Sequence, residues 1–577
     1  MNNPKNYQHY LALIGLITLG AMLRFWHLDL KPLWLDEVLT ALLSLGSRYE
    51  DVPLDVVFPA STLQHLFTLK SSLSCPEIAQ AVATKSTHPP LFFCLMHQWL
   101  NWLEPFGQSL SWKLRSLPAI LGVIAIALIY LLNRLAFSPT AGLISAAVMA
   151  VSPFAVYLSQ EARHYTLPML FLILALLGLI QIQKSLAAQK LSHLLVWLFW
   201  GIVNSIGCYI HYFFFIAFIA QILTFIALMF WRRRVLPRGS LLTLALVILG
   251  VAVSYLPWLP VMLGSFGRAE TAWLPKPTII APIYQTLAGW LSIAIAFPVE
   301  SQPLWVQIPS ILLTVGFGIW LARLAWQGFR KLQQQATVAA FTLSGFILFV
   351  LLQFAAIVYL LGKDITVAPR YNFVYYPAVC AILGACFAQI NSTPTPNHIT
   401  PTSFLEKFRL FPLLKKRWRR LLPLFIALLS SFFVVNNLVF LKPFHPQKVA
   451  LDMNFEPTTP IVMVMGYKNF QDVALGLSFA LAIAQNHETN HNKNTEPNFA
   501  FLTTKLGYEQ VWNNLASLSI LPTPRLNLWV VAPGLKQRNY PAKLILKNQS
   551  SCLLDSTKYY RIGIPYQLYR CALKPRL

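Results

Sequence analysis

Runs of about 20 consecutive apolar residues recur along this chain, and they limit its possible folds more than any other feature. About 20 helical residues are needed to cross the hydrocarbon core of a bilayer. Only 11% of the 577 residues are charged, whereas about a quarter are charged in a soluble domain. The sequence therefore predicts a polytopic α-helical membrane protein with about eleven transmembrane helices. The first span begins near Tyr10 and has no small-x-small cleavage site before Arg24, so we expect it to be a retained signal anchor.

Basic residues greatly outnumber acidic ones, with 45 Lys and Arg against 20 Asp and Glu and a net charge of +25. In a soluble chain this excess suggests nucleic acid, but cytoplasmic loops of membrane proteins are also rich in Lys and Arg. We therefore expect no nucleic-acid partner. The clusters follow alternate predicted spans: Arg134; Lys184 and Lys190; Arg232–Arg234; Arg330 and Lys331; Lys415–Arg420. They share the cytoplasmic side only if the apolar segment 278–297 does not cross, so we expect that segment to be a surface or re-entrant helix.

These assignments predict two domains in a plasma (inner) membrane protein. Residues 1–441 form the transmembrane domain, whose long first loop, 27–111, lies outside the cytoplasm. Residues 442–577 form an extracytoplasmic α/β domain, in which Thr459–Gly466 and Leu526–Ala532 are predicted strands and Asp472–Ala484 a predicted helix. The stretch 391–403 is rich in Pro, Thr and Asn, and is typical of a linker.

The chain has seven cysteines without a C-x-x-C pair, so a zinc site is not indicated. Cys380 and Cys386 lie in an apolar run, and we expect them in the core. Cys552 and Cys571 lie in the polar tail, where an extracytoplasmic location would allow a disulfide between them.

Two adjacent carboxylates, Asp36 and Glu37, follow the first apolar span in the stretch Leu33–Glu37. Ionisable groups at a membrane boundary are costly to bury and commonly functional. A positioned carboxylate can act as a general base that takes a proton from a hydroxyl. The alternative interpretation is local, since Asp36 could simply cap a surface helix over 37–45. The residues leave both interpretations open.

Two further polar clusters are candidates for phosphate binding. His88 precedes Pro89-Pro90 and a predicted helix over 91–103, and helix N-termini attract phosphate. Glu161 and Arg163 lie in a short loop with Tyr165, where Glu161 is a possible second acid and Arg163 a forked phosphate ligand. For each cluster the alternative is structural: a simple helix start at His88, and interfacial anchoring at Arg163 and Tyr165.

Arg370 and Tyr371 begin the tenth predicted span on its outer side. Because basic residues generally mark the cytoplasmic side, an arginine on the outer side favours a paired or ligand-facing role for Arg370. Lys363 is a weaker candidate for binding the donor phosphate. His211 is a weaker candidate for substrate contact, together with Tyr165 and Tyr371. A lone histidine is more often structural than functional, and the sequence leaves both roles open for His211.

Five strings in order resemble the C-type (GT-C) fold of glycosyltransferases, in particular the protein O-mannosyltransferase and lipid A aminoarabinose transferase relatives. They are "LWLDE" after the first span, "THPPL" in the same loop, "RSLPA" at Arg115–Ala119, "SPFAVYLSQEARHYTLP" between the third and fourth spans, and "APRYNFVYYPA" at Ala368–Ala378. Each string alone is weakly specific, but their order holds over most of residues 1–390.

The resemblance implies an inverting transfer of a monosaccharide from a polyprenyl-phosphate donor to a hydroxyl of a lipid, glycan or protein on the extracytoplasmic face. It implies that Asp36 is the base with Glu37 beside it, and that His88 lies near the donor phosphate. Some relatives carry an aspartate after the third span, and here the nearest acid is Glu161. No glutamate precedes His88, so the metal site of some relatives is not supported and no metal ligands are expected. Besides the donor and membrane lipids no cofactor is expected, and a requirement for a divalent metal stays open.

Two other functions compete with a glycosyltransferase. A transporter or flippase of lipid-linked sugars would also place charges at membrane depth, but such proteins often have paired internal repeats, and no repeat is visible here. A noncatalytic assembly subunit is the third hypothesis, and it predicts that the Asp36 carboxylate is dispensable.

Overall fold

The structure, a computed structural model, describes residues 4–188, 194–231, 239–265, 274–389, 410–489, 496–518, 524–547 and 550–572. Lys190, Arg232–Arg234 and the predicted linker 391–403 lie outside these residues, as do the side chains of Lys415–Arg420. The chain forms two compact units. Unit 1 comprises Met1–Leu28, Thr87–Phe92 and Arg115–Leu441; unit 2 comprises Asp29–Ser86, Phe93–Leu114 and Lys442–Leu577.

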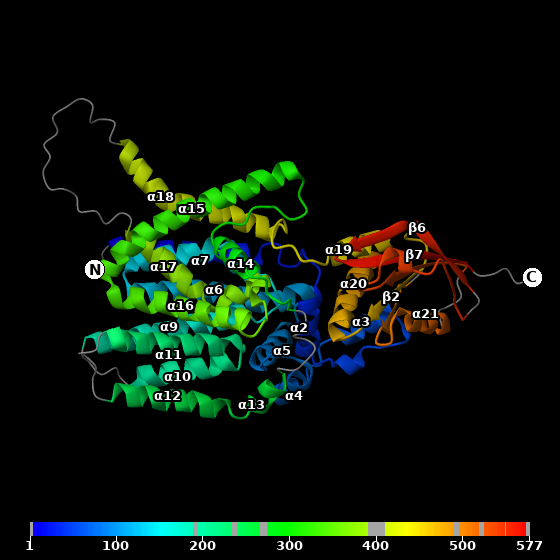
Figure 1. Ribbon diagram of the computed structural model, residues 1–577, viewed down its shortest axis with the longest axis horizontal. Helices are drawn as coiled ribbons and strands as arrows, with labels where there is room; N and C mark the ends of the chain where they lie inside the picture. Colours follow the sequence, from blue (N-terminus) through cyan, green and yellow to red (C-terminus); the bar gives the residue numbers. More distant parts are fainter. Residues whose placement is uncertain are drawn as a thin grey trace, which may run out of the picture. The chain divides into compact units, whose positions relative to one another are not determined.

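Unit 1 is helical (Figure 1). Its helices are α1 Pro4–Phe25, α6 Leu110–Ala136, α7 Pro139–Val151, α8 Pro153–Ser159, α9 Thr166–Ala187, α10 Leu194–Cys208, α11 Phe213–Trp231, α12 Ser240–Tyr255, α13 Leu259–Ser265, α14 Ala281–Leu291, α15 Leu304–Gln335, α16 Thr337–Tyr359, η3 Ile365–Val367, η4 Pro369–Val374, α17 Tyr376–Gln389 and α18 Leu410–Val435. Unit 1 is therefore the part of the chain that carries the predicted spans.

Among the described residues, six helices are long and apolar enough to cross a membrane, or up to eight if each of two bent pairs is one span. The bent pairs are α7 with α8, at 59°, and α12 with α13, at 73°. The multi-pass architecture is confirmed, and the predicted number of about eleven spans is reached only if the shorter apolar helices α10, α17 and 421–435 of α18 also cross. Within 278–297, α14 has 11 residues and is about 16 Å long, too short to cross.

The bend between α7 and α8 occurs at Ser152-Pro153, where proline interrupts the helical hydrogen-bond ladder. Arg24 of α1 is fully buried there, and its guanidinium donates to the carbonyls of Met149 (3.0 Å) and Ala150 (3.1 Å). Ser152 donates to the Ile293 carbonyl at 2.7 Å. These contacts satisfy backbone groups that no water would reach at this depth.

Small residues allow close approach of the helices around α17. A Cβ added to Gly384 would lie 2.6 Å from the Ser145 Cα of α7, and one added to Gly328 of α15 would lie 2.8 Å from the Cys386 Cα. Helix packing in membranes relies on such small-residue contacts. Cys380 and Cys386 are both buried, as predicted.

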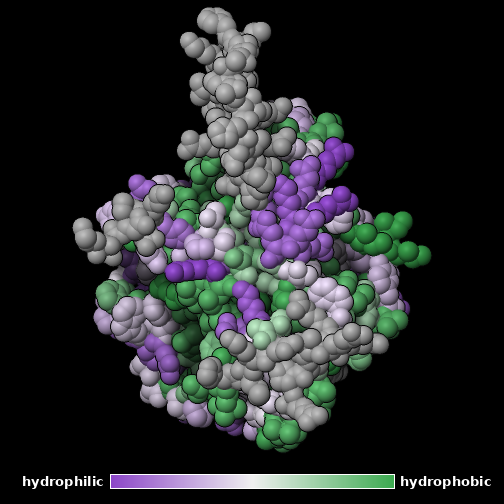
Figure 2. Space-filling view, turned by 90° about the vertical axis from the view of Figure 1, so that its left-hand side faces the viewer, coloured by the Kyte–Doolittle hydropathy of each residue, from purple (hydrophilic) through white to green (hydrophobic). Residues whose placement is uncertain are grey.

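The basic ends of α6, α9 and α15 lie at one end of unit 1, where α1 begins. Arg134 donates to the Tyr10 hydroxyl at 3.1 Å, and Lys184 donates to the Leu135 carbonyl. Phe329 and Leu332, next to Arg330 and Lys331, belong to one apolar cluster with Phe137. Figure 2 views this end and shows hydrophilic side chains gathered among apolar ones. The described clusters therefore share one end, as the orientation argument required.

Unit 2 contains a seven-stranded sheet in the order β1-β3-β2-β4-β7-β6-β5. Its strands are β1 Val57–Pro59, β2 Ile461–Tyr467, β3 Asn498–Thr503, β4 Arg525–Val531, β5 Lys543–Ile545, β6 Ser551–Ile562 and β7 Ile564–Ala572. Its helices are α2 Leu35–Leu45, η1 Tyr49–Asp51, α3 Ala60–Leu66, α4 Cys75–Lys85, α5 Leu91–Leu103, which starts in unit 1, α19 Pro446–Met453, α20 Phe470–Thr489, α21 Tyr508–Ser517 and η6 Gln537–Asn539. The predicted tail strands and helix correspond to β2, β4 and α20, which confirms a C-terminal α/β fold.

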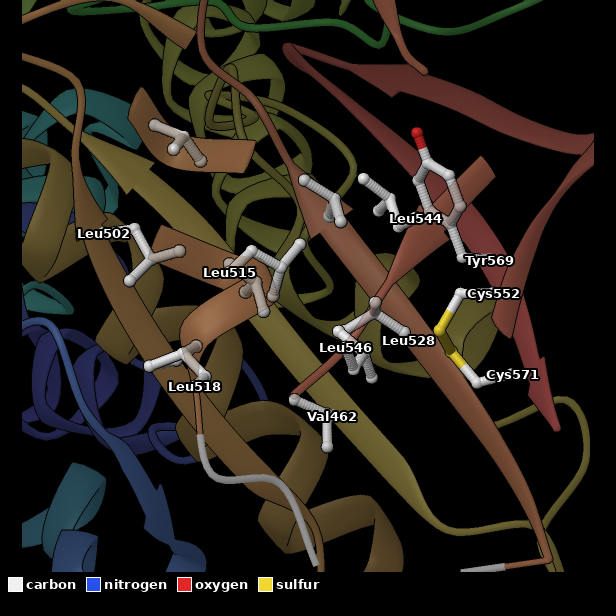
Figure 3. Packing of buried hydrophobic residues seen from close by; sticks show 14 of the residues in the cluster. Val462, Leu502, Leu515, Leu518, Leu528, Leu544, Leu546, Cys552, Tyr569 and Cys571 are labelled. Atoms are coloured by element: carbon white, nitrogen blue, oxygen red, sulfur yellow. A yellow bond between two sulfur atoms is a disulfide. The ribbon is translucent and has the colours of Figure 1, made fainter. Parts of the chain in front are cut away.

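Both faces of the central strands are covered, because their side chains alternate between the faces. Val462 and Val464 of β2 share a core with Leu515 of α21, whereas Met465 faces α20 near Gly476. Figure 3 shows the first of these cores, with the Cys552–Cys571 disulfide at its edge. That pairing agrees with the expectation from sequence.

The first loop contributes to this sheet, which differs from the predicted division of the chain at residues 441/442. Val57 and Pro59 of β1 pair antiparallel with Ala500 and Asn498 of β3, and the Ser478 hydroxyl of α20 donates to the Leu33 carbonyl at 2.8 Å. Residues 29–86 therefore fold with the tail, while the loop's Thr87–Phe92 belongs to unit 1. Such long-range pairing has no local signal in the sequence.

Candidate functional site

Three loops bring three histidines together in unit 1. His88 lies between α4 and α5, His164 between α8 and α9, and His211 between α10 and α11. The ring centroid of His164 lies 4.4 Å from that of His88 and 4.7 Å from that of His211. The Leu91 N–H donates to the Tyr209 carbonyl at 3.2 Å, which ties the His88 loop to the α10–α11 turn. We call His88, His164 and His211 the histidine cluster.

Two arginines border the histidine cluster. Arg163 precedes His164, and Arg370 lies on the short helix η4. Burial, together with the positive charges of Arg163 and Arg370, lowers the pKa of His88 to about 3. The same burial and neighbouring positive charge hold the pKa values of His164 and His211 well below their usual range. At neutral pH the cluster is therefore three uncharged imidazoles beside two permanent cations.

His211 carries a hydrogen-bond donor that no described residue accepts. Its Nδ1 accepts the Phe213 N–H at 3.0 Å, so the ring proton of the neutral imidazole is on Nε2. Nε2 is buried and has no hydrogen-bond partner among the described residues, and the side chain is only 5% exposed. An unsatisfied buried donor is costly, so this N–H is available to an acceptor from a ligand. The observation favours the functional interpretation of His211.

Glu161 and Tyr165 come from the same loop as Arg163. Both are buried, and the Glu161 carboxylate hydrogen-bonds the Tyr157 hydroxyl of α8. The Arg163 guanidinium lies 5.9 Å from the centroid of the Tyr165 ring. The local reason for this compact loop is the end of α8 at Ser159, followed by turns until α9 starts at Thr166.

Aromatic rings line one side of the histidine cluster. Phe373 lies 4.8 Å from His211 and 5.8 Å from Tyr165, between ring centroids. Tyr371 lies 4.7 Å from Phe213, and the Arg370 guanidinium lies 5.8 Å from the Tyr371 centroid. Arg370 and Tyr371 are therefore near the cluster, as their position in the sequence suggested.

Lys363 differs from the other candidates. Its side chain is exposed, and no contact among the described residues joins it to the histidine cluster. Its backbone N–H donates to the Ile357 carbonyl at 3.4 Å, which ends the α16 helix. The structure therefore supplies no contact that would place Lys363 at the donor phosphate.

Asp36 and Glu37 lie in unit 2, in the first turn of α2. The helix begins at Leu35, so Asp36 is not its N-cap, contrary to the local alternative. Glu37 is 1% exposed, and its Oε2 accepts the Trp34 N–H at 3.3 Å, the contact of a capping box. Glu37 thus has a structural role, whereas the Asp36 side chain is half-buried.

Sequence reasoning overlooked His164 and Phe373 as site residues. His164 is fully buried and has a histidine on either side. Its signal was a third ionisable residue in the Glu161–Tyr165 loop, but a loop has no periodicity that tells which side chains point inward. Within the described part of the chain, no group of three or more His, Cys, Asp or Glu residues could hold a metal ion.

A chain with apolar helices, an α/β unit and loops that gather cationic and aromatic groups at one end has the architecture of the GT-C glycosyltransferases. The solved structures bear this out: the chain is similar to ArnT from Cupriavidus metallidurans bound to undecaprenyl phosphate, with a TM-score of 0.51 and 12% identity over 96% of this chain and 97% of that one. The apo state of the same protein gives a TM-score of 0.50 and 11% identity over the same shares of both chains. The predicted resemblance to this fold is confirmed.

Residues 87–258 match the family model described as dolichyl-phosphate-mannose-protein mannosyltransferase. This segment carries His88, the Glu161–Tyr165 loop and His211. The archaeal oligosaccharyltransferase AglB from Archaeoglobus fulgidus, solved with an inhibitory peptide and a dolichol-phosphate, gives a TM-score of 0.48 and 14% identity over 83% of this chain and 64% of its own. No curated protein matches the chain in sequence.

Proposed function

We propose that this protein is a membrane glycosyltransferase that moves a monosaccharide from a polyprenyl-phosphate donor to a hydroxyl acceptor, with Asp36 as the base. The observation that carries the proposal is the Nε2–H of His211, which has no acceptor among the described residues and lies in a histidine cluster subject to the positive charges of Arg163 and Arg370. A phosphate supplies acceptor oxygens for this N–H, and its negative charge is attracted by the two guanidinium groups. The undecaprenyl phosphate in the similar ArnT structure is a ligand of this chemical class.

The reaction assigns separate roles to the two acidic residues of α2. Glu37 is used in the helix cap, so Asp36 is the better candidate for proton transfer. Its carboxylate takes the proton of the acceptor hydroxyl as the acceptor oxygen bonds to the anomeric carbon. The bond from that carbon to the phosphate oxygen breaks in the same displacement, which inverts the configuration. The polyprenyl phosphate leaves with the bonding pair, and its charge is stabilised by Arg163 and Arg370.

The cysteines support an extracytoplasmic location for unit 2. Both disulfides, Cys75–Cys94 and Cys552–Cys571, lie in unit 2, whereas the free cysteines of the described chain, Cys208, Cys380 and Cys386, lie in unit 1. Disulfides persist in oxidising compartments and are rare in the cytosol. The transfer would then take place on the outer side of the membrane.

Binding of undecaprenyl phosphate to the full chain in nanodiscs, followed by native mass spectrometry, tests the phosphate site. Arg370→Ala removes one charge-assisted contact, and such contacts contribute about 1.5–3 kcal/mol. We expect the dissociation constant to rise by at least tenfold. Arg330→Ala, which removes an arginine from the opposite, basic end of unit 1, is the matched control and should leave it unchanged. Undecaprenol, which has no phosphate, should bind the wild type, Arg370→Ala and Arg330→Ala with equal affinity.

Asp36→Asn tests the catalytic role. We expect this variant to bind undecaprenyl phosphate as the wild type does, while glycan mass profiles of a deletion strain complemented with it should match those of the deletion. Complementation by Asp36→Asn would refute the role of the carboxylate as base and would favour a flippase or an assembly subunit. Unchanged lipid binding in Arg370→Ala would refute the phosphate site.

A further inference from the structure

Unit 2 contains a cleft of about 630 Å³ that the transfer chemistry described above does not use. Its walls come from the segment Asp29–Leu33, from α3, from the start of α6 within unit 2, and from the C-terminal half of α20. This volume is in the range of sites for small ligands, about 300–1,000 Å³.

The cleft has an apolar floor and a polar rim. Leu33, Leu63, Phe67 and Ala482 are buried residues of its lining. The exposed polar residues of its lining include Asp29, Gln64, Gln485, Glu488 and Glu496. Carboxylate and amide oxygens accept hydrogen bonds from hydroxyl and amine groups. A sugar ring has the matching character, because it presents a face of C–H groups and an edge of hydroxyls.

The charge of the cleft is opposite to that of the protein as a whole. Asp29, Glu488 and Glu496 carry negative charge, and among the described residues of the lining Lys31 is the one lysine or arginine. The whole chain, in contrast, has a net charge of +25. The carboxylates of the rim repel a bound anion, so the cleft disfavours phosphorylated or carboxylated ligands and favours neutral or amine-bearing ones.

The cleft adjoins the segment that leads into the Asp36 helix. Leu33 lines the cleft, and its carbonyl is fixed to α20 by the Ser478 hydroxyl at 2.8 Å. Asp36 follows three residues later, in the first turn of α2. Three residues of chain span at most about 11 Å, so a ligand of a few sugar units reaches from the cleft toward this carboxylate.

We infer that this cleft binds the acceptor, and that the acceptor is a neutral or amine-bearing saccharide. The role of this saccharide as the acceptor rests on the proposed function, whereas the binding of a saccharide to unit 2 does not. Hydroxyls of the bound saccharide hydrogen-bond the rim carboxylates and amides, and its C–H face packs on the floor beside Phe67. The terminal hydroxyl is then presented to the Asp36 carboxylate.

Saturation-transfer NMR titrations of the full chain in detergent with three tetrasaccharides test this inference. The probes are tetramers of N-acetylglucosamine (neutral), glucosamine (cationic) and galacturonic acid (anionic). We expect the first two to bind at least tenfold more tightly than the third. Ala484→Trp, which places a large side chain in the cleft, should abolish binding. Asn513→Trp on the exposed face of α21 is the matched control and should bind as the wild type does.

The charge of the rim is tested by the double variant Glu488→Gln/Glu496→Gln. Exposed charge pairs contribute about 0.2–1 kcal/mol each, so we expect its affinity for the cationic tetramer to fall about fivefold, with little change for the neutral one. Glu509→Gln, outside the cleft, should have no effect. Binding that survives Ala484→Trp, or tightest binding of the anionic tetramer, would overturn the inference. Asp36→Asn should still bind the saccharide, so loss of transfer in that variant is separate from loss of this site.

Discussion

The two disulfides of unit 2 allow a matched test of how the His88 loop is held. Cys75–Cys94 and Cys552–Cys571 each join residues 19 positions apart. In the chain-entropy description, closing a loop of this size stabilises the folded state by about 3 kcal/mol at 25 °C. Replacing either pair by serine should therefore destabilise unit 2 by a similar amount.

The two double variants should differ in function, because only one disulfide brackets the site. His88 lies between Cys75 and Cys94, in the turn that joins α4 to α5. Cys552–Cys571 joins two neighbouring antiparallel strands at positions that are direct cross-strand partners. We expect Cys75→Ser/Cys94→Ser to weaken the binding of undecaprenyl phosphate severalfold, because the turn must then be ordered on binding. Cys552→Ser/Cys571→Ser should bind the lipid as the wild type does.

Thermal unfolding in nanodiscs and lipid titration by native mass spectrometry give the two readouts. Treatment of the wild type with a reductant should reproduce the Cys75→Ser/Cys94→Ser result if that bond is accessible. Equal losses of lipid affinity in both double variants would refute the reasoning, since they would reflect general destabilisation. Unchanged affinity in both would mean that packing alone positions His88.

Three other perturbations have expected outcomes. The pKa of His88 lies at about 3, below its ordinary 6.5, so between these pH values the unfolded chain binds a proton that the folded chain does not. The free energy of unfolding should therefore fall as the pH drops below about 6.5. A His88→Gln variant should show a smaller fall in melting temperature over the same pH range. Gly384→Val forces a side chain into α7 and should cost about 1–3 kcal/mol or more, whereas Gly316→Ala, at a position with open space, should be neutral by the same measurement. Glu37→Ala leaves the Trp34 N–H without its acceptor and should destabilise unit 2 by about 1 kcal/mol in chemical unfolding, with Glu509→Ala as the surface control.

Local patterns in the sequence predicted the helical unit well, because a membrane span is defined by composition over a continuous window. The same is true of β2 and β4, whose runs of buried apolar residues are bounded by Pro or Gly. In contrast, β1 is three residues long and exists through its pairing with β3, more than 400 residues away. A pattern of that length is indistinguishable from loop, so the participation of the first loop in the tail sheet was not predictable.

The candidate site shows the same limit at the level of single residues. Sequence reasoning found the loops that carry Arg163, His211 and Arg370, because charge beside an apolar span is visible in composition. It did not find His164, since which side of the six-residue loop 160–165 faces inward is decided by neighbours from other segments, Phe92 of α5 and the two histidines His88 and His211. It named Asp36 as the base, with Glu37 beside it, through the family resemblance alone, and the part that Glu37 takes in the helix cap is visible only in its hydrogen bond with the Trp34 N–H.

The position of the basic residues and of the histidine cluster at opposite ends of α9 connects topology to chemistry. α9 begins directly after the Glu161–Tyr165 loop and carries Lys184 in its last turn. Its 22 residues span about 33 Å, close to the hydrocarbon thickness of a bilayer. If Lys184 and Arg134 mark the cytoplasmic side, Arg163 lies at the outer headgroup level, where charge is not needed for orientation. The planar fork of an arginine at that level can bind a phosphate through two hydrogen bonds, and this is the interaction that the proposed membrane-anchored donor requires.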